Sequence, residues 1–406
     1  ADKLKCSTGN LMKPNLIIIG GGLVGLATGW HYLQNNPGAK LTVLEKEDGV
    51  GLHQSGRNSG VLHSGIYYKP GSLRATMCMS GKRMMEDFIE QEGLGKDICG
   101  KVIVARTQEE LPQLDIILDK GQRNGVECEM IGRERLLEIE PHVNGIQAIH
   151  VPSAGIADYP AVAVRLAQRI VEKGGNLVLG AKVLGIDERP GEVVVQTTKG
   201  DFNGDQLVSC AGLYSDRIAR MTAEDEQIEA EILPFRGEYF QLKKSAEHLV
   251  NGLIYPVPDP RFPFLGVHYT KMIEGGIDCG PNAVLAFARE GYNKSDFNGK
   301  DLWDALSYRG FRKLAFKYWR KGLGEMWRSY NQAAFVKELQ KLIPAVTGAD
   351  IEPHPAGVRA MAITPSGEMH DDFAFLETKR CIHVVNAPSP AATASLRIGQ
   401  HVAGKI

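Results

Sequence analysis

The hydrophobic pattern near the start of the chain predicts a strand, a helix and a second strand. Residues 16–19 form a short β-branched run that is typical of a buried parallel strand. Residues 23–34 favour a helix, which the Asn-Asn-Pro-Gly turn at 35–38 ends, and residues 41–44 form another apolar strand. The stretch 14–39 contains no charged residue, but glycines and the turn interrupt it. We therefore do not interpret it as a membrane-spanning helix.

Similar patterns continue along the chain. They predict helices over 80–92, 109–124 and 160–173 and strands over 101–105, 177–179, 183–186, 193–195 and 206–209. The following third of the chain contains longer strands with aromatic residues, at 237–242, 252–255, 264–269 and 284–288. The last predicted elements are a helical block over 300–342, a strand over 382–385 and a helix over 391–404.

A chain that leaves one α/β arrangement and returns to it at its C-terminus indicates a discontinuous domain with an insertion. We therefore expect an α/β fold, α+β overall, in which a Rossmann-like cofactor-binding domain carries an inserted antiparallel-sheet substrate domain capped by helices. We expect the cofactor-binding domain over 1–95, 146–225 and 350–406 and the substrate domain over 96–145 and 226–349.

Composition narrows the functional classes. The 47 Lys and Arg residues nearly balance 48 Asp and Glu, so the chain lacks the basic excess of a nucleic-acid-binding protein. The seven cysteines are too scattered for a local zinc site, and we expect no bound metal. Glycine is in excess, with 46 residues, which indicates many tight turns or close approaches of the backbone to a bound group.

A glycine-rich turn joins the first predicted strand and helix. The sequence GGGLVG at 20–25 matches G-x-G-x-x-G, in which glycines allow the backbone to approach a pyrophosphate at the helix N-terminus. Glu45 ends the second strand, where its carboxylate can accept the hydroxyl groups of an adenosine ribose. The motif therefore predicts a dinucleotide, but it does not separate FAD from NAD.

Four later segments are rich in glycine and other small residues. The loop over 51–65 also contains two histidines, and no helix or strand requires its composition. The segments 208–216, 356–367 and 386–395 are interpreted as small-residue turns that follow strands. We expect these segments, distant in the sequence, to meet around one long cofactor.

At this level of detail the sequence resembles the D-amino-acid oxidase superfamily of FAD enzymes, which includes glycine oxidase and sarcosine oxidase. Within it, the chain is similar to the L-2-hydroxyglutarate dehydrogenases from about residue 14 onward. The strings that carry the resemblance are HQSGRNSGVLHSGIYYKP at 53–70, CAGLYSDR at 210–217, PFRGEYF at 234–240, YPVPDPRFPFLGVHYT at 255–270, GPNAVLAF at 280–287 and NAPSPAATAS at 386–395.

The resemblance implies an FAD-dependent oxidation of L-2-hydroxyglutarate to 2-oxoglutarate. The C2 hydrogen would pass as hydride to flavin N5 while a histidine accepts the hydroxyl proton. It further implies a mitochondrial location, with association to the inner membrane, and transfer of electrons to an electron carrier or quinone rather than to oxygen. Two alternatives stay open at this point: an amine or amino-acid oxidase of the same fold, and a non-catalytic flavin-binding protein.

The resemblance also assigns residues to a noncovalently bound FAD. The N-terminal N–H groups of the last helix would stabilise negative charge at the flavin N1–C2 carbonyl. The assigned positions are Gly20, Gly22, Gly25, Glu45 and Lys46 for the ADP half, Ser55, Gly56, Ser59, Gly60 and Val61 for the path from pyrophosphate to flavin, Val183 for the adenine, Ala211 and Gly212 for the ribityl chain, and Gly357, Ala391, Ala392 and Thr393.

Three residues are assigned to the substrate. His268 is favoured as the base, and His63 could instead orient or polarise the alcohol. Arg359 stands where the superfamily has the arginine that binds the substrate carboxylate, although Ala360 replaces the proline that follows it in relatives. A five-carbon dicarboxylate needs a second cation, and the candidates that stay open are Arg57, Arg236, Arg261 and Lys271.

The helical block over 300–342 combines basic and aromatic residues. Seven Lys or Arg residues and one Glu occur from Arg309 to Arg328, with Trp319 and Trp327 among them. Such a helix can lie on an anionic membrane surface. The alternative is a layer that caps the substrate domain with a solvated basic face.

Overall fold

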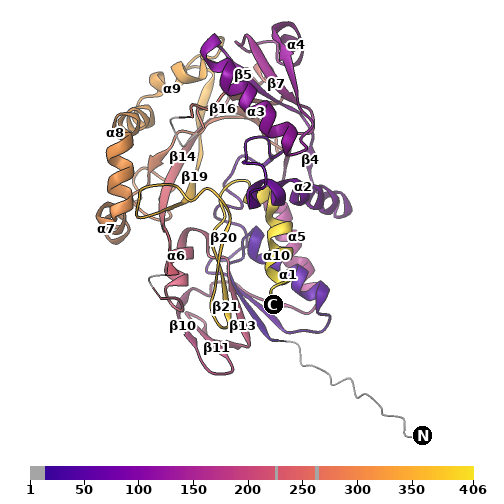
Figure 1. The fold of residues 1–406 in the computed structure, drawn as a ribbon, viewed down its shortest axis with the longest axis vertical. Helices are drawn as coiled ribbons and strands as arrows, with labels where there is room; N and C mark the ends of the chain where they lie inside the picture. Colours follow the sequence, from indigo (N-terminus) through magenta and orange to yellow (C-terminus); the bar gives the residue numbers. More distant parts are fainter. Residues whose placement is uncertain (1–13, 225–226, 261–264) are drawn as a thin grey trace, which may run out of the picture.

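The computed structural model describes residues 14–224, 227–260 and 265–406 (Figure 1). One of its two large sheets has six strands in the order β20-β21-β13-β1-β2-β9. They are β1 (Leu16–Ile19), β2 (Leu41–Leu44), β9 (Asn176–Val178), β13 (Gln206–Ser209), β20 (Ala374–Glu377) and β21 (Cys381–Asn386). The pairs are parallel except β20–β21. All four residues of β1 are buried, as the apolar run of a central parallel strand requires.

Four helices pack around this sheet: α1 (Leu23–Asn35), α2 (Leu73–Gln91), α5 (Tyr159–Glu172) and α10 (Ala391–Ala403). They share one hydrophobic core with the strands. The helices α1 and α10 lie side by side, because Gly399 lets the two backbones approach where a Cβ would overlap Ala27. The last helix of the chain is thereby held against the first, next to the glycine-rich turn.

The second large sheet has nine strands, in the order β18-β14-β17-β16-β15-β5-β7-β6 with β19 paired to β14. They are β5 (Lys101–Ala105), β6 (Glu129–Gly132), β7 (Gln147–Val151), β14 (Glu231–Leu242), β15 (Leu253–Pro256), β16 (His268–Lys271), β17 (Ile277–Gly280), β18 (Val284–Leu285) and β19 (Ile351–Ile363). The pair β15–β5 is parallel and the others are antiparallel.

Smaller elements complete the described chain. The strands are β3 (Val61–Leu62), β4 (Lys96–Asp97), β8 (Gly155–Ala157), β10 (Val183–Glu188), β11 (Val193–Thr197) and β12 (Gly200–Gly204). The helices are η1 (Gln108–Glu110), α3 (Leu111–Arg123), α4 (Arg133–Ile139), η2 (Gly212–Tyr214), α6 (Ser215–Ala219), η4 (Glu247–Leu249), α7 (Gly299–Ser307), α8 (Arg309–Tyr330) and α9 (Gln332–Leu339). Figure 1 shows α7, α8 and α9 grouped beside β14 and β19. No helix in the described ranges has the length and apolar character needed to cross a membrane.

The expected α/β fold is confirmed, but several boundaries differ. The interpretation of 356–367 as a turn was wrong, because most of it belongs to β19, which pairs along β14 from Ile351 to Ile363. The helix expected from residue 80 starts at Leu73, where the Ser72 hydroxyl accepts the Ala75 N–H and caps it. The strand expected over 264–269 forms over His268–Lys271, and residue 264 lies outside the described residues. Only two residues of 284–288 are in a strand.

The proposed division into two domains stays a prediction. Two segments that we assigned to the cofactor-binding domain, β7 and β19, pair with strands of the nine-stranded sheet. The chain therefore crosses between the two large sheets more often than the expected boundaries imply.

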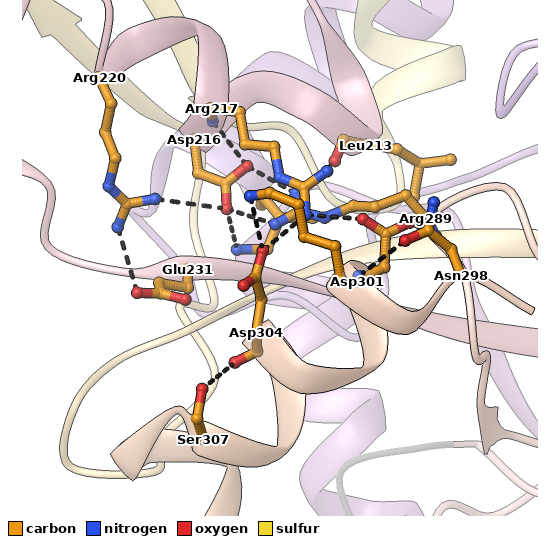
Figure 2. A network of polar contacts seen from close by, with 12 residues as sticks. Leu213, Asp216, Arg217, Arg220, Glu231, Arg289, Asn298, Asp301, Asp304 and Ser307 are labelled. Carbon is orange, nitrogen blue, oxygen red and sulfur yellow. Dashed lines mark hydrogen bonds and ion pairs between the residues drawn. The ribbon is translucent and has the colours of Figure 1, made fainter.

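A buried network of ion pairs joins the two large sheets (Figure 2). The Arg289 guanidinium donates to both carboxylate oxygens of Asp216 on α6, at 2.6 and 2.8 Å. It also donates to the carbonyl of Leu213 in the turn that follows β13. Asp216 in turn accepts the N–H of Ile232 on β14, and Asp301 on α7 accepts the N–H of Arg289. The network fixes α7 and β14 to the turn that follows β13.

We expect Arg289→Met to destabilise the protein by about 3–5 kcal/mol, because it removes the cation that bonds both oxygens of the buried Asp216 carboxylate and leaves only the longer contact with Arg220, at 3.8 Å. Both side chains are nearly inaccessible to solvent, at 6% and 2%. The matched control is Lys96→Met, which removes a pair with the exposed Glu90 and is expected to cost about 1 kcal/mol or less. Denaturant unfolding of the two variants measures the difference, and equal costs would contradict the assigned role of the network.

Candidate active site

The glycine-rich turn between β1 and α1 forms a cradle of bare backbone. Gly20 has φ +107°, and a Cβ there would overlap the carbonyl oxygen of Cys210. A Cβ on Gly25 would in turn overlap the carbonyl of Gly20. Gly22 is the N-cap of α1 and supplies no side-chain cap, and the first turn of the helix contains no acidic residue. The positive end of the helix dipole is therefore available to a phosphate group, so the cradle fits a dinucleotide.

Glu45 lies beside this turn, at the end of β2. Its buried carboxylate accepts the N–H groups of Gly21 at 2.7 Å and of Glu47 at 2.9 Å. Its carbonyl accepts the N–H of Ala181 at 2.8 Å, two residues before Val183. The structure thus brings Glu45 and Val183 to the same end of the six-stranded sheet.

Lys46 lies in a separate polar cluster. Its ammonium group forms ion pairs with Glu47 and Glu290, and Nζ lies 3.0 Å from Nε2 of His53. It also lies 5.5 Å from the centre of the Tyr214 ring. The positive charge of Lys46 is therefore shared with two carboxylates of the protein.

The loop over 51–60 crosses the N-terminus of α1. The Ser55 hydroxyl accepts the N–H of Leu23 at 3.0 Å, which fixes the loop to the glycine-rich turn. Gly56 and Gly60 each lie where a Cβ would press on a backbone carbonyl oxygen. Ser59 lies between these two close approaches and is partly buried. The loop is therefore held closely against the cradle.

The N-terminus of α10 meets the end of this loop. The Thr393 hydroxyl lies 2.8 Å from the Tyr159 hydroxyl, accepts the N–H of His63 and donates to the carbonyl of Val61. Ala392 and Thr393 belong to the first turn of α10, where N–H groups have no partner within the helix. These N–H groups lie close to the loop that carries His63.

Two further glycines bring distant segments against the same loop. Ala211 and Gly212 form the turn after β13, and Gly212 has φ +53° with its open side facing Oε1 of Gln54. On β19, a Cβ at Gly357 would overlap the carbonyl oxygen of Arg57. Since β19 belongs to the nine-stranded sheet, this contact places one face of that sheet against the loop over residues 51–65, which we call the cofactor loop.

Side chains from several strands gather on that face. His268 on β16 lies beside Tyr255 on β15, with ring centres 4.0 Å apart. On the far side, the Lys101 ammonium on β5 lies 4.2 Å from the centre of the same Tyr255 ring. In the other direction, Arg359 on β19 hydrogen-bonds Tyr239 on β14. The strand that carries His268 therefore lies between the strands that carry Lys101 and Arg359.

His268 is held as a neutral imidazole in one tautomer. Its Nδ1 lies 2.9 Å from the carbonyl oxygen of Gly266, so this nitrogen carries the proton and Nε2 keeps its lone pair. Burial lowers the pKa of His268 to about 3, and the charges of Arg359 and Lys101 act in the same direction. The residue can therefore accept a proton at Nε2.

His63 lies at the end of the cofactor loop, near the start of α10. Its carbonyl accepts from the Cys78 thiol, and Nε2 lies 3.2 Å from the Ser389 hydroxyl. Burial lowers the pKa of His63 well below its ordinary value, and the charges of Lys101 and Arg74 add to the shift. Both histidines are therefore neutral and feel the charge of the same lysine.

The electrostatic surroundings of Arg359 differ from those of the buried arginines. Among the residues that the structure describes, no carboxylate forms an ion pair with its guanidinium, which is partly exposed. Its charge nevertheless reaches both histidines, since it contributes to the lowered pKa of His63 and of His268. An unpaired arginine beside two neutral histidines is suited to binding a carboxylate.

The cations considered for a second anion site make other contacts in the structure. Arg236 is buried and pairs with Glu238, and Lys271 pairs with Asp97 at 2.8 Å. Arg57 donates to the carbonyl of Leu52, and its guanidinium lies over the ring of Tyr292. Arg261 lies outside the described residues. None of these contacts directs Arg236, Lys271 or Arg57 toward the face of the sheet that carries His268.

Sequence reasoning missed Lys101. It opens the run KVIVA, which was correctly predicted as a strand, and its side chain is only 2% exposed. Burial lowers its pKa to about 8. The sequence signal for this residue was a lysine at the start of an otherwise apolar strand. A lysine in such a place is rarely buried unless it is paired, so a buried one indicates a special role.

Together these residues can perform one kind of chemistry. An arginine without an acidic partner binds a carboxylate, a neutral histidine accepts a proton, and the adjoining loop and helix N-terminus fit a flavin dinucleotide. This combination is typical of flavoenzymes that oxidise a carbon next to a carboxylate.

Comparison with known proteins agrees with this class. The model of the FAD dependent oxidoreductase family matches residues 15–405. The chain belongs to this family, it is an FAD-dependent oxidoreductase, and the prediction of FAD as its cofactor is confirmed.

Within the family, the similar curated proteins are L-2-hydroxyglutarate dehydrogenases. The one from Indibacter alkaliphilus is 49% identical over 95% of this chain and 96% of its own length. The one from Homo sapiens, named as mitochondrial, is 43% identical over 97% of this chain and 88% of its own length. At these identities the chain belongs to the L-2-hydroxyglutarate dehydrogenase family, as the sequence strings predict.

The fold has a solved counterpart. L-α-glycerophosphate oxidase from Mycoplasma pneumoniae with FAD bound superposes with a TM-score of 0.78, covering 97% of this chain and 95% of that one. The two sequences are only 20% identical, so the similarity concerns the fold alone. It confirms the expected α/β fold.

Proposed function

We propose that the protein oxidises L-2-hydroxyglutarate to 2-oxoglutarate with FAD. The names of its relatives support the substrate. The observation that carries the proposal is the pairing of a fixed, neutral His268 with Arg359, which lacks a carboxylate partner among the described residues. A 2-hydroxy acid supplies both missing groups, a carboxylate for the arginine and a hydroxyl proton for the histidine.

The chain's own residues account for the binding of both molecules. The backbone of the 20–25 turn and the N-terminus of α1 hold the pyrophosphate, and Glu45 lies where it can accept the ribose hydroxyl groups. The N–H groups at the start of α10 would hold the flavin side of the cofactor and would favour negative charge on it. Arg359 binds the C1 carboxylate through its bidentate fork.

The substrate proton then passes to His268. Bound FAD supplies the acceptor for the C2 hydrogen and its two electrons. Nε2 of His268 accepts the hydroxyl proton because Nδ1 is already committed to the Gly266 carbonyl. The negative charge of the bound substrate raises the pKa of His268 from its low value, which improves it as a base. His63 orients the hydroxyl from the other side.

Anaerobic mixing of the FAD-loaded enzyme with L-2-hydroxyglutarate tests the proposal. We expect the visible absorption of the oxidised flavin to disappear, with formation of one 2-oxoglutarate per flavin, and no change with D-2-hydroxyglutarate. Glutamate serves as the control for an amino-acid oxidase. Bleaching by glutamate instead, or by none of the three compounds, would overturn the proposed substrate.

We expect His268→Gln to lower kcat by a factor of about 10² to 10⁴, because glutamine fills similar space but cannot accept the proton. The amount of FAD bound per chain should stay unchanged, since His268 lies on β16 of the nine-stranded sheet and not in the glycine-rich turn. Rapid single-turnover flavin reduction measures the chemical step directly. A wild-type rate in this variant would remove His268 as the base.

We further propose that the enzyme passes electrons to a quinone or another carrier at a membrane surface. The support is a surface patch of apolar side chains on α7 and α8 that are 54–84% exposed. The patch consists of Trp303, Phe316, Trp319, Leu323, Trp327 and Tyr330. Seven Lys or Arg residues share α8 with it, so the surface suits an anionic bilayer. A mitochondrial location stays part of the proposal, because it enters only through the names of eukaryotic relatives.

Binding of the protein to lipid vesicles tests this second proposal. We expect the protein to sediment with phosphatidylglycerol vesicles but weakly with phosphatidylcholine vesicles, and high salt should release it. The double variant Phe316→Ser, Trp327→Ser should lower binding at least tenfold, since each ring buries apolar area in the interface. Ile116→Ser, which removes an exposed apolar residue of α3, is the control. Equal binding by both variants would contradict the assignment.

A further inference from the structure

The buried lysine on β5 has no role in the reaction described so far. Lys101 is 2% exposed, and among the described residues no carboxylate pairs with it. A buried ammonium without a counter-charge is costly, so its retention requires a compensating interaction. The aromatic rings beside it supply only part of this, at 4.2 Å from Tyr255 and 5.5 Å from Tyr67.

A second unsatisfied group lies next to this lysine. The hydroxyl of Tyr67 is shielded from solvent and has no hydrogen-bond partner in the described part of the chain. Tyr67 follows directly on the segment that carries His63, so the loop and the sheet each contribute one polar group to the same place. Among the described residues, a buried ammonium without a carboxylate partner and a hydroxyl without a hydrogen-bond partner can serve as donors to one anion.

The position of the pair relative to the base indicates which anion it takes. Arg359 and Lys101 lie on strands on opposite sides of β16, which carries His268, and the charges of both act on His268 and on His63. A substrate whose C2 hydroxyl reaches His268 and whose C1 carboxylate reaches Arg359 extends its remaining carbons toward β15 and β5. On that side Lys101 is a cation without a carboxylate partner among the described residues.

We propose that Lys101, assisted by the hydroxyl of Tyr67, binds the distal carboxylate of the substrate and thereby selects a five-carbon dicarboxylate over a 2-hydroxy acid with an apolar tail. This inference rests on the proposed function and adds a specificity-determining residue to it. It also replaces the three cations considered from the sequence that the structure describes, since these have other contacts.

The test compares two substrates of equal length. L-2-hydroxyglutarate carries the distal carboxylate and L-2-hydroxypentanoate carries a methyl group in its place. The wild-type enzyme should prefer the first by a large ratio of kcat/KM. In Lys101→Met this ratio should fall by about 10- to 100-fold, since one charge-assisted contact is lost. The loss should appear mainly in KM for the dicarboxylate, and L-2-hydroxypentanoate should be affected little.

Controls separate this role from a structural one. Lys243→Met, an exposed lysine just after β14 in the same sheet, should keep the wild-type ratio. Lys101→Arg retains the charge and should keep most of it. If Lys101→Met does not retain FAD, Tyr67→Phe provides the same comparison with a smaller fall in the ratio.

Two results would overturn the inference alone: an unchanged ratio in Lys101→Met, or equal losses on both substrates. A wild-type enzyme that oxidises neither compound would overturn the proposed function itself, together with this inference. The two failures are therefore distinguishable.

Discussion

The close backbone contact between Gly357 and the carbonyl of Arg57 is the constraint on which the rest of the site depends. It joins a strand of the nine-stranded sheet to the loop that crosses the FAD cradle, at a place where any side chain would overlap the carbonyl oxygen. Arg359 lies two residues further on the same strand, and His63 lies at the end of the same loop. The substrate side chains and the flavin loop therefore meet because this contact exists, and the Arg289–Asp216 pair secures the junction from the side of α6.

The charges around the two histidines then determine which chemistry the site can perform. The charges of Arg359 and Lys101 act on both His63 and His268, Arg74 adds to them at His63, and desolvation keeps both imidazoles neutral. Two of these cations, Arg359 and Lys101, have no ion pair with a carboxylate of the described chain. A dianionic substrate satisfies this excess of positive charge and at the same time raises the proton affinity of the base. In the proposed function, the substrate balances this local excess of positive charge in a protein whose overall charge is nearly neutral.

Much of this arrangement could be predicted from the sequence, because local patterns encode it. The strand–turn–helix at 16–35 and Glu45 follow from a motif whose glycines have a steric reason. The strand β19 escaped prediction because its small residues are typical of a turn, and only its pairing with β14 shows that it is extended. Lys101 escaped for a related reason. Its burial depends on strands β15 and β16, which are more than 150 residues away in the sequence, and no local pattern reveals that proximity.

The most direct test of this account is a crystal structure of the FAD-loaded enzyme with 2-oxoglutarate bound. The account predicts that the C1 carboxylate is bidentate to Arg359, that the C2 oxygen lies within hydrogen-bond distance of Nε2 of His268, and that the flavin ring lies between the 51–65 loop and the nine-stranded sheet. A product molecule bound elsewhere, or with its C2 oxygen remote from His268, would contradict the central claim.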